Sequence, residues 1–335
     1  MAFALEVGMS GSPMRRRTVL LGGLGLAGAS IASLVQLSRP KPGQTTRLED
    51  GGPVGSSSTR PLASSASGRP TLRMGWSPWA DAEVVSLIAQ QVIQQAYDIQ
   101  VERVLADIGI QYASVARGDL DMMLMAWLPL THRDYWTRVR DRVVDFGSMY
   151  SGRLGWVVPD YVSESEVRSI PNLRDPAIAS RFGDQVQGID PGSGLNQASE
   201  EALRVYNLRD LKLVSSSSAA MTAVLDQAIR QQRWVVVTSW TPHWMFARYK
   251  LRFLDDPDRV FGGIEWIHAL GRQQLDLDMP EVAGFLTRFH LPDRELSDLL
   301  LAANETSAEA AVEAYLARHP ARVRYWTTGE IGAAG

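Results

Sequence analysis

Residues 71–93 read TLRMGWSPWADAEVVSLIAQQVI, and this stretch decides the fold. Residues 71–76 form a short apolar run that is typical of a buried strand. After the turn signal Ser77-Pro78, apolar residues recur at the spacing of one helical face: Val84, Leu87, Ile88, Val92 and Ile93. A strand that leads directly into a helix is the repeating unit of α/β proteins.

The same alternation continues along the chain to about residue 240. Further strands are predicted at residues 99–105, 120–127, 155–159, 185–189, 211–214 and 234–238, with helix-sized segments between them. We expect the strands near residues 72, 99 and 120 to form one sheet and those near 186, 212 and 235 another. The prediction is an α/β fold of two lobes, each a mostly parallel sheet flanked by helices, with the ligand cleft between the lobes.

Three of the predicted strand ends carry tryptophan next to proline. They are residues 76–79 (WSPW), 127–129 (WLP) and 240–244 (WTPHW). A single tryptophan more often belongs to the core, but ligands of open α/β sheets bind beyond the carboxyl ends of the strands. Several indole rings at one cleft are suited to a quaternary ammonium group, which has no N–H to donate and is bound through cation–π attraction.

Composition excludes several classes of protein. The chain has 335 residues and a net charge of −3, but residues 1–70 hold eight basic and three acidic residues, which leaves −8 for residues 71–335. An acidic body of this kind does not suit nucleic acid. The absence of cysteine rules out disulfides, thiolate zinc sites and cysteine nucleophiles. The sequence also lacks a nucleophile elbow, a dinucleotide or phosphate-loop fingerprint and a histidine pair with metal-ligand spacing, so we expect no enzyme activity, no cofactor and no metal.

Two further segments carry polar candidates. Residues 188–196 (GIDPGSGLN) are either a plain strand-to-helix turn or a helix N-terminus that faces the cleft, with Ser193 and Asn196 as ligand contacts. His243 lies inside the third tryptophan segment, where its ring N–H could meet a carboxylate. The other four histidines are expected at the surface or at helix ends: His132, His268, His290 and His319.

The N-terminal segment has the layout of an export signal. A basic cluster at residues 15–17 precedes the apolar, glycine-rich residues 19–35, and the arginine pair followed after one residue by Val19-Leu20 resembles a twin-arginine signal. A retained membrane anchor is the alternative. We therefore predict an export signal or anchor over residues 1–37, a flexible linker over residues 38–70, and a periplasmic location for the body, which stays tethered to the membrane if the segment is not cleaved.

Four stretches, in order, resemble one family. They are residues 118–136 (GDLDMMLMAWLPLTHRDYW), 188–194, 215–221 and 240–257, and together they extend over about residues 71–330. They are similar to the substrate-binding proteins of ABC importers for glycine betaine and related quaternary ammonium compounds. The resemblance implies a two-lobed periplasmic-binding-protein fold of type II-like topology that closes around its ligand. Lobe 1 is then expected over residues 71–153 and 250–335, and lobe 2 over residues 154–249. The resemblance also implies a separate permease and ATPase as partners.

In this family an aromatic cage holds the ammonium group. The resemblance maps cage positions to Trp127, Trp240 and Trp79, with Trp76 competing for the position of Trp79. Where some relatives have further aromatic residues, this chain has Ser193 and Leu154, and Trp156 or Trp244 are the possible replacements.

The polar end of the ligand decides between candidates. For the carboxylate of glycine betaine, the resemblance points to the backbone amides of Ala80 and Asp81 and to the ring of His243. Choline-binding relatives have an acidic residue two positions after the first cage tryptophan, and Asp81 occupies that place in this chain. The segment of Trp240 with its His243 matches the betaine-binding group over a longer run than the single Asp81 matches the choline-binding group, so glycine betaine is the expected ligand. Choline, carnitine or proline betaine are alternatives, and an exported α/β enzyme is a remote one.

Overall fold

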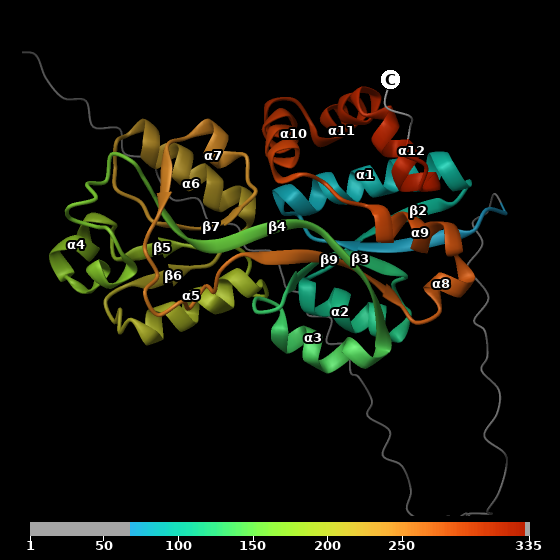
Figure 1. Cartoon of the computed structure of the whole chain (residues 1–335). Coiled ribbons are helices and arrows are strands. Elements are labelled where there is room, and N and C mark those ends of the chain that lie inside the picture. The colour runs from blue at the N-terminus through green and yellow to red at the C-terminus, as the bar shows by residue number, and fades with distance from the viewer. Residues whose placement is uncertain (1–67, 332–335) are drawn as a thin grey trace, which may run out of the picture. The chain divides into compact units, whose positions relative to one another are not determined.

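A computed structural model describes residues 68–331 of the chain, which form the strands and helices of Figure 1. The strands are β1 (Thr71–Trp76), β2 (Gln100–Leu105), β3 (Met122–Leu128), β4 (Val143–Pro159), β5 (Gln185–Gln187), β6 (Lys212–Val214), β7 (Val237–Thr241), β8 (Leu251–Phe253) and β9 (Glu265–Arg272). The α-helices are α1 (Ala80–Tyr97), α2 (Ile108–Arg117), α3 (Arg133–Val139), α4 (Pro176–Arg181), α5 (Gly194–Val205), α6 (Ser218–Arg230), α7 (Met245–Arg248), α8 (Leu275–Asp278), α9 (Pro280–Arg288), α10 (Asp293–Glu305), α11 (Ala308–Arg318) and α12 (Pro320–Thr328). Two short 3-10 helices are η1 (Arg140–Arg142) and η2 (Ile170–Arg174).

The first sheet has the strand order β2-β1-β3-β9-β4. Strands β2, β1 and β3 are parallel, whereas β9 is antiparallel to both β3 and β4. All seven residues of β3 (MMLMAWL) are buried, as expected for a strand whose sheet is covered on both faces. Helices α1 and α9 to α12 lie on one side of this sheet and α2 and α3 on the other (Figure 1).

The second sheet is formed by β4, β7, β5 and β6 in that order, with β8 pairing to β4. Strands β6, β5 and β7 are parallel, while β7 and β8 are antiparallel to β4. Strand β4 belongs to both sheets, because residues 143–152 pair with β9 and residues 153–157 pair with β7. Gly152 lies at this change of partner, where a Cβ atom would collide with the Thr241 carbonyl and the Trp127 ring.

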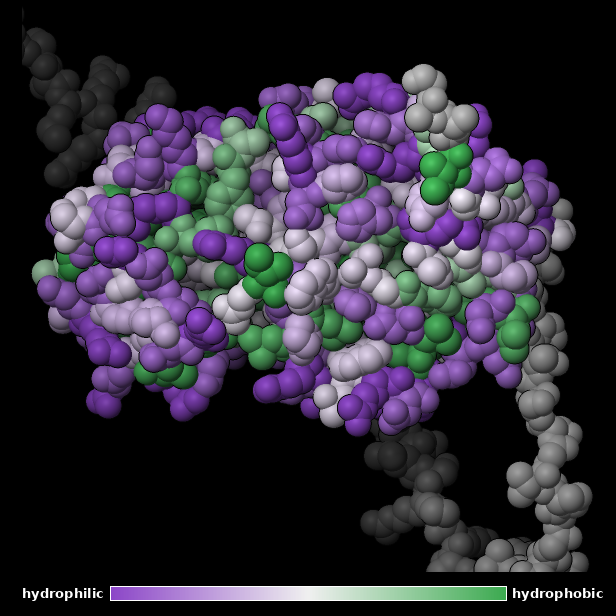
Figure 2. Space-filling view, in the orientation of Figure 1, coloured by the Kyte–Doolittle hydropathy of each residue, from purple (hydrophilic) through white to green (hydrophobic). Residues whose placement is uncertain are grey.

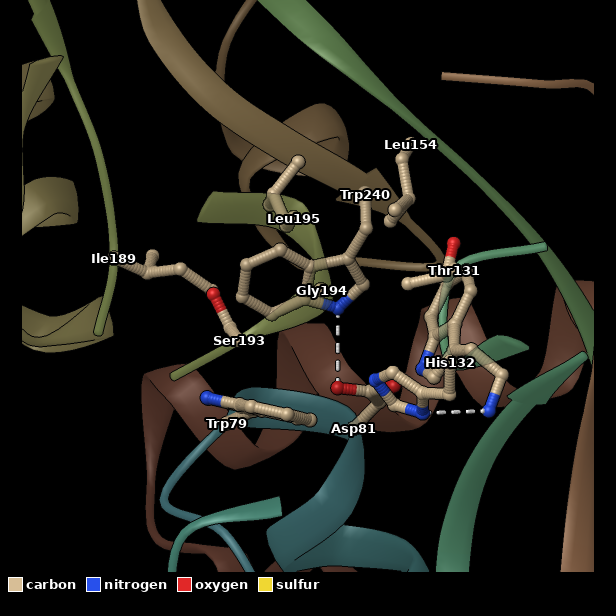
Figure 3. A pocket seen from close by; sticks show the side chains of 11 residues that line it. Trp79, Asp81, Thr131, His132, Leu154, Ile189, Ser193, Gly194, Leu195 and Trp240 are labelled. Carbon is tan, nitrogen blue, oxygen red and sulfur yellow. Dashed lines mark hydrogen bonds between the residues drawn. The ribbon is translucent and has the colours of Figure 1, made fainter. Parts of the chain in front are cut away.

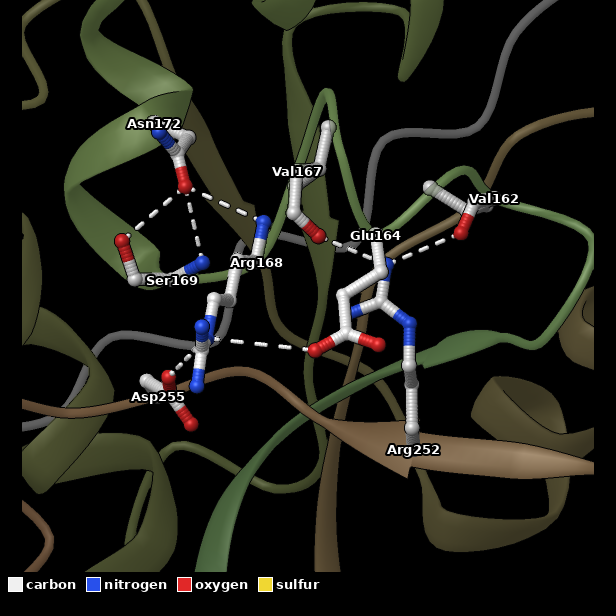
Figure 4. Close-up of polar contacts among 8 residues, drawn as sticks. All are labelled: Val162, Glu164, Val167, Arg168, Ser169, Asn172, Arg252 and Asp255. Carbon is white, nitrogen blue, oxygen red and sulfur yellow. Dashed lines mark hydrogen bonds and ion pairs between the residues drawn. The ribbon is translucent and has the colours of Figure 1, made fainter.

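The segment that follows β4 is fastened to β8 by polar contacts (Figure 4). The guanidinium of Arg252 donates to the carbonyls of Val162 (2.9 Å) and Val167 (2.6 Å). Arg168 pairs with Asp255 at 3.0 Å. These bonds hold residues 251–255 against the second sheet.

The predicted α/β class with two lobes is confirmed, and the predicted strands group into the two expected sheets. Three strand segments were not predicted, the first part of β4, β8 and β9, and all their partners are antiparallel. The beginning of β4 (VVDFGSMYSG) mixes polar, glycine and partly exposed residues, so it lacks the continuous apolar run that marks the parallel strands. Residues 251–253 form β8 and pair with the second sheet, although the predicted boundary at 249/250 places them in lobe 1. The division into lobe 1 (71–153 and 250–335) and lobe 2 (154–249) stays a prediction.

The predictions for residues 1–37, and for the linker up to residue 67, lie outside the described residues. Within residues 68–331, every helix is too short or too polar to cross a membrane. Figure 2 shows one face of the molecule, on which hydrophilic residues predominate and hydrophobic ones are scattered between them.

Candidate ligand-binding site

The ends of strands from both sheets surround one cavity (Figure 3). The space between its lining atoms, open solvent included, is about 300 Å³. Its eleven lining residues are Trp79, Asp81, Trp127, Thr131, His132, Leu154, Ile189, Ser193, Gly194, Leu195 and Trp240. Two of these residues have ionisable side chains, Asp81 and His132, and the remaining wall is mostly apolar.

Three predicted tryptophans come together at this cavity. Trp79 follows β1 and directly precedes α1, Trp127 lies in β3, and Trp240 lies in β7 of the other sheet. Their side chains are buried, and in Figure 3 Trp79 and Trp240 reach the cavity from different sheets. Indole faces in a desolvated space attract cations through the negative potential of the ring.

Asp81 brings a carboxylate into the cavity wall. It lies in the first turn of α1 with no exposed surface, and it accepts hydrogen bonds from the Tyr150 hydroxyl (2.8 Å) and from the Trp240 indole (3.0 Å). Burial raises the pKa of Asp81 to about 6, against the opposing effect of these bonds and of the backbone N–H groups of Asp81 and Ala82. Most Asp81 side chains are therefore ionised at pH 7, and the cavity carries one negative charge.

Trp79 also has a carboxylate partner. Its indole N–H donates to Asp190, in the glycine-rich turn after β5, at 2.8 Å. The bonds Trp79–Asp190 and Trp240–Asp81 thus each join the start of α1, beside the first sheet, to β7 or the turn after β5, in the second.

His132 lines the cavity although the sequence predicted it at the surface or at a helix end. It does precede α3, but its side chain is buried. Its Nδ1 accepts a hydrogen bond from the backbone N–H of Trp127 (3.1 Å), so the ring proton is on Nε2. Burial lowers the pKa of His132 to about 3, although a backbone hydrogen bond with Met125 opposes this, and the ring is neutral at physiological pH.

Two of the residues predicted to bind the carboxylate of glycine betaine, His243 and Ala80, do not line this cavity. His243 is not among the residues that line this cavity; it lines a neighbouring one with Thr241 and Pro242. Its ring packs edge-on against Trp240 with 4.6 Å between ring centroids, and its Nδ1 accepts from the Met245 backbone N–H. Burial lowers the pKa of His243 to about 3, so it presents no positive charge. Ala80 begins α1 but is also absent from the lining.

Of the remaining predicted site residues, some line the cavity and others do not. Ser193 lines the cavity and caps α5 by accepting from the Asn196 backbone N–H (3.1 Å), whereas the Asn196 side chain accepts from Ser215 (3.0 Å) away from the lining. Leu154 lines the cavity. The three other tryptophans do not: Trp76 lies beneath the Arg103 guanidinium at 4.7 Å, Trp156 donates to Ser199, and Trp244 packs between His243 and Tyr249.

Three residues at or next to the cavity were not predicted from the sequence: Tyr150, Thr131 and Glu265. Tyr150 belongs to the part of β4 that was not predicted. Thr131 falls in a stretch that carries the family resemblance, which is a signal that was available. Buried Glu265 holds the loop after β3 by accepting from the backbone N–H groups of Leu130 and Thr131, and its distance of more than 130 residues along the chain left no sequence signal.

Comparison with protein families gives one match over most of the chain. Residues 70–318 match the family described as the substrate binding domain of ABC-type glycine betaine transport system. The described fold is similar to the crystal structure of a lactococcal protein of this type, closed and in complex with glycine betaine. The TM-score is 0.70 at 32% sequence identity, and the match covers 77% of this chain and 99% of that one.

Two characterised bacterial proteins are similar over shorter ranges. A glycine betaine/carnitine transport binding protein of Listeria monocytogenes is 39% identical over 147 residues, 43% of this chain and 49% of that protein. A glycine betaine/proline betaine-binding periplasmic protein of Escherichia coli is 27% identical over 189 residues, 53% of this chain and 56% of that protein. The chain spans about half the length of these relatives.

Proposed function

Because the chain belongs to the family of substrate-binding domains of ABC-type glycine betaine transport systems, we propose that it captures a small quaternary ammonium compound and delivers it to an ABC importer. This family consists of transport proteins that bind a substrate without converting it, so the alternative of an exported α/β enzyme is set aside. The predicted partners are a membrane permease and an ATPase on separate chains. The arginine pair near the N-terminus, and the periplasmic relative of Escherichia coli, support a periplasmic location.

One observation carries this proposal: Trp79, Trp127 and Trp240 line one cavity together with the buried carboxylate of Asp81. A methylated ammonium group combines a positive charge with an apolar surface. Indole rings suit both properties, and the charge of Asp81 would balance that of a cationic ligand.

Glycine betaine is the first candidate. The Listeria relative and the lactococcal structure, which are 39% and 32% identical, are both named for it. Its carboxylate requires a donor, and the backbone N–H groups of Asp81 and Ala82 already interact with the Asp81 side chain. The Nε2–H of His132, in the cavity wall, is the candidate donor, and it would exchange its hydrogen bond with the Met125 backbone for one with the ligand carboxylate.

Choline is the second candidate, and Asp81 is the observation that favours it. Choline is a net cation with a hydroxyl group, so it would neutralise the charge of Asp81 and donate a hydrogen bond to its carboxylate. Glycine betaine is a zwitterion whose carboxylate would be repelled by Asp81.

Calorimetric titration of the purified protein with glycine betaine, choline, carnitine and proline betaine tests the proposal. We expect saturable 1:1 binding of at least one of them. Glycine and ethanolamine, which have the same polar ends but no methyl groups on nitrogen, serve as matched controls and should bind far more weakly. A protein that is folded but binds none of the four compounds, or binds the unmethylated controls equally well, would contradict the proposal.

A further inference from the structure

Two hydrogen bonds across the cavity form a reciprocal pair. Trp79 donates to Asp190 of the second sheet, and Asp81, two residues after Trp79, accepts from Trp240 of the second sheet. Each sheet therefore contributes one indole N–H and one carboxylate. The family resemblance assigned no role to Asp190, which does not line the cavity.

The turn that carries Asp190 is built to hold the carboxylate in place. The Asp190 backbone carbonyl accepts from both the backbone N–H (3.1 Å) and the hydroxyl (2.8 Å) of Ser193. Ser193 in turn caps α5. The turn is thereby fixed to the end of a twelve-residue helix, and the carboxylate is directed to the Trp79 indole.

The bond to Asp190 satisfies the indole N–H of Trp79. The residue is 6% exposed, so an indole N–H without a partner would lose a hydrogen bond at a largely buried position. The residue precedes α1 as its N-cap and makes no side-chain cap bond to the helix. Asp190 is accordingly the polar anchor that selects one ring orientation.

We propose that Asp190 is a positioning residue for ligand binding, which orients the Trp79 ring toward the ligand by accepting its indole hydrogen bond from the opposite sheet. This inference rests on the proposed function. A carboxylate at the ring edge also increases the negative potential of the ring face, which adds to the attraction for a cation. Asp190 acts through Trp79 and touches no ligand.

A double-mutant cycle with calorimetric titration tests the inference. Asp190→Ala should weaken binding of the quaternary ammonium ligand about tenfold, because the hydrogen bond from the Trp79 indole to a charged acceptor is lost. Trp79→Phe keeps an aromatic ring but removes the N–H, and the double variant should bind no more weakly than Trp79→Phe alone. Asp190→Asn retains an acceptor and should recover part of the affinity. Asp210→Ala, which removes an exposed carboxylate between α5 and β6, is the matched control and should bind like the parent.

A second readout separates this inference from the proposed function. In the NMR spectrum of protein with 15N-labelled tryptophan, the indole signal absent from Trp79→Phe identifies Trp79, and Asp190→Ala should shift it upfield. Parental affinity in Asp190→Ala, additive losses in the double variant, or an unmoved Trp79 signal would overturn the positioning role. If the parent protein binds no quaternary ammonium compound, the proposed function fails, while the NMR result still reports on the Trp79–Asp190 bond.

Discussion

Replacing Trp127 with leucine isolates the cation–π contribution that we propose for one tryptophan ring of the cavity. Leucine retains apolar volume where alanine would leave a cavity, which at a buried tryptophan costs about 3–5 kcal/mol of stability. A desolvated cation–π contact contributes about 2 kcal/mol. Since 1.36 kcal/mol corresponds to a factor of ten, the dissociation constant of the quaternary ammonium ligand should rise about thirtyfold.

Calorimetric titration measures the effect, with thermal unfolding as the check that the variant is folded. Trp266→Leu is the matched control, because Trp266 is 49% exposed on β9 and lies outside the cavity, and it should bind like the parent. A neutral isostere of choline, 3,3-dimethylbutanol, provides a second comparison: the parent should prefer the cation strongly, and Trp127→Leu should prefer it less. A folded Trp127→Leu variant that binds within threefold of the parent, or keeps the full preference for the cation, would refute the reasoning.

Four further predictions concern Asp81 and the N-terminal segment. Asp81→Asn should weaken choline binding at least tenfold, because a charge-assisted hydrogen bond and the balancing charge are lost, while glycine betaine binding should persist or improve; titration of both ligands measures this, and equal losses would contradict it. The choline affinity of the parent should be constant above pH 7 and should decline below about pH 6, because Asp81 then takes up a proton. Titration of Asp81→Asn is the control and should show no such pH dependence. Tyr150 and His132, which contact or adjoin Asp81, do not titrate between pH 5 and 8. In the ligand-free protein, folding raises the pKa of Asp81. The contribution of Asp81 to the free energy of unfolding should therefore be present below pH 4 and be lost as the pH rises through about 6, and urea titrations at several pH values would measure this loss. Replacing Arg16 and Arg17 with lysine should leave the precursor in the cytoplasm, and cell fractionation that finds mature protein in the periplasm would contradict the twin-arginine interpretation.

The parallel strands and their tryptophans could be predicted because their information is local. A buried parallel strand such as β3 is a continuous apolar run, and the carboxyl ends of such strands converge wherever their sheet is placed. Trp79, Trp127 and Trp240 therefore meet at one cavity without any need to know the contacts between distant residues.

The polar part of the site could not be predicted, because its partners come from strands that the sequence concealed. Tyr150 reaches Asp81 from β4, and Glu265 holds the loop after β3 from β9. The positions of the two histidines also could not be told from the sequence. His132 and His243 both follow a tryptophan and a proline, and their backbone hydrogen bonds distinguish them: His132 accepts from Trp127 in the cavity wall, whereas His243 accepts from Met245 at the start of α7.

The hydrogen bonds of the three cavity tryptophans decide how the proposed aromatic cage should be tested. Trp79 and Trp240 each have an indole N–H bound to a carboxylate of the other sheet, so removing either ring changes both the cation–π surface and the contact between the sheets. Within residues 68–331, the Trp127 indole makes no hydrogen bond, and its ring packs against Gly152 where β4 passes between sheets. A loss of affinity in Trp127→Leu therefore measures the ring itself, and a larger loss in Trp79→Leu or Trp240→Leu measures, by difference, how much the crossing hydrogen bonds contribute to binding.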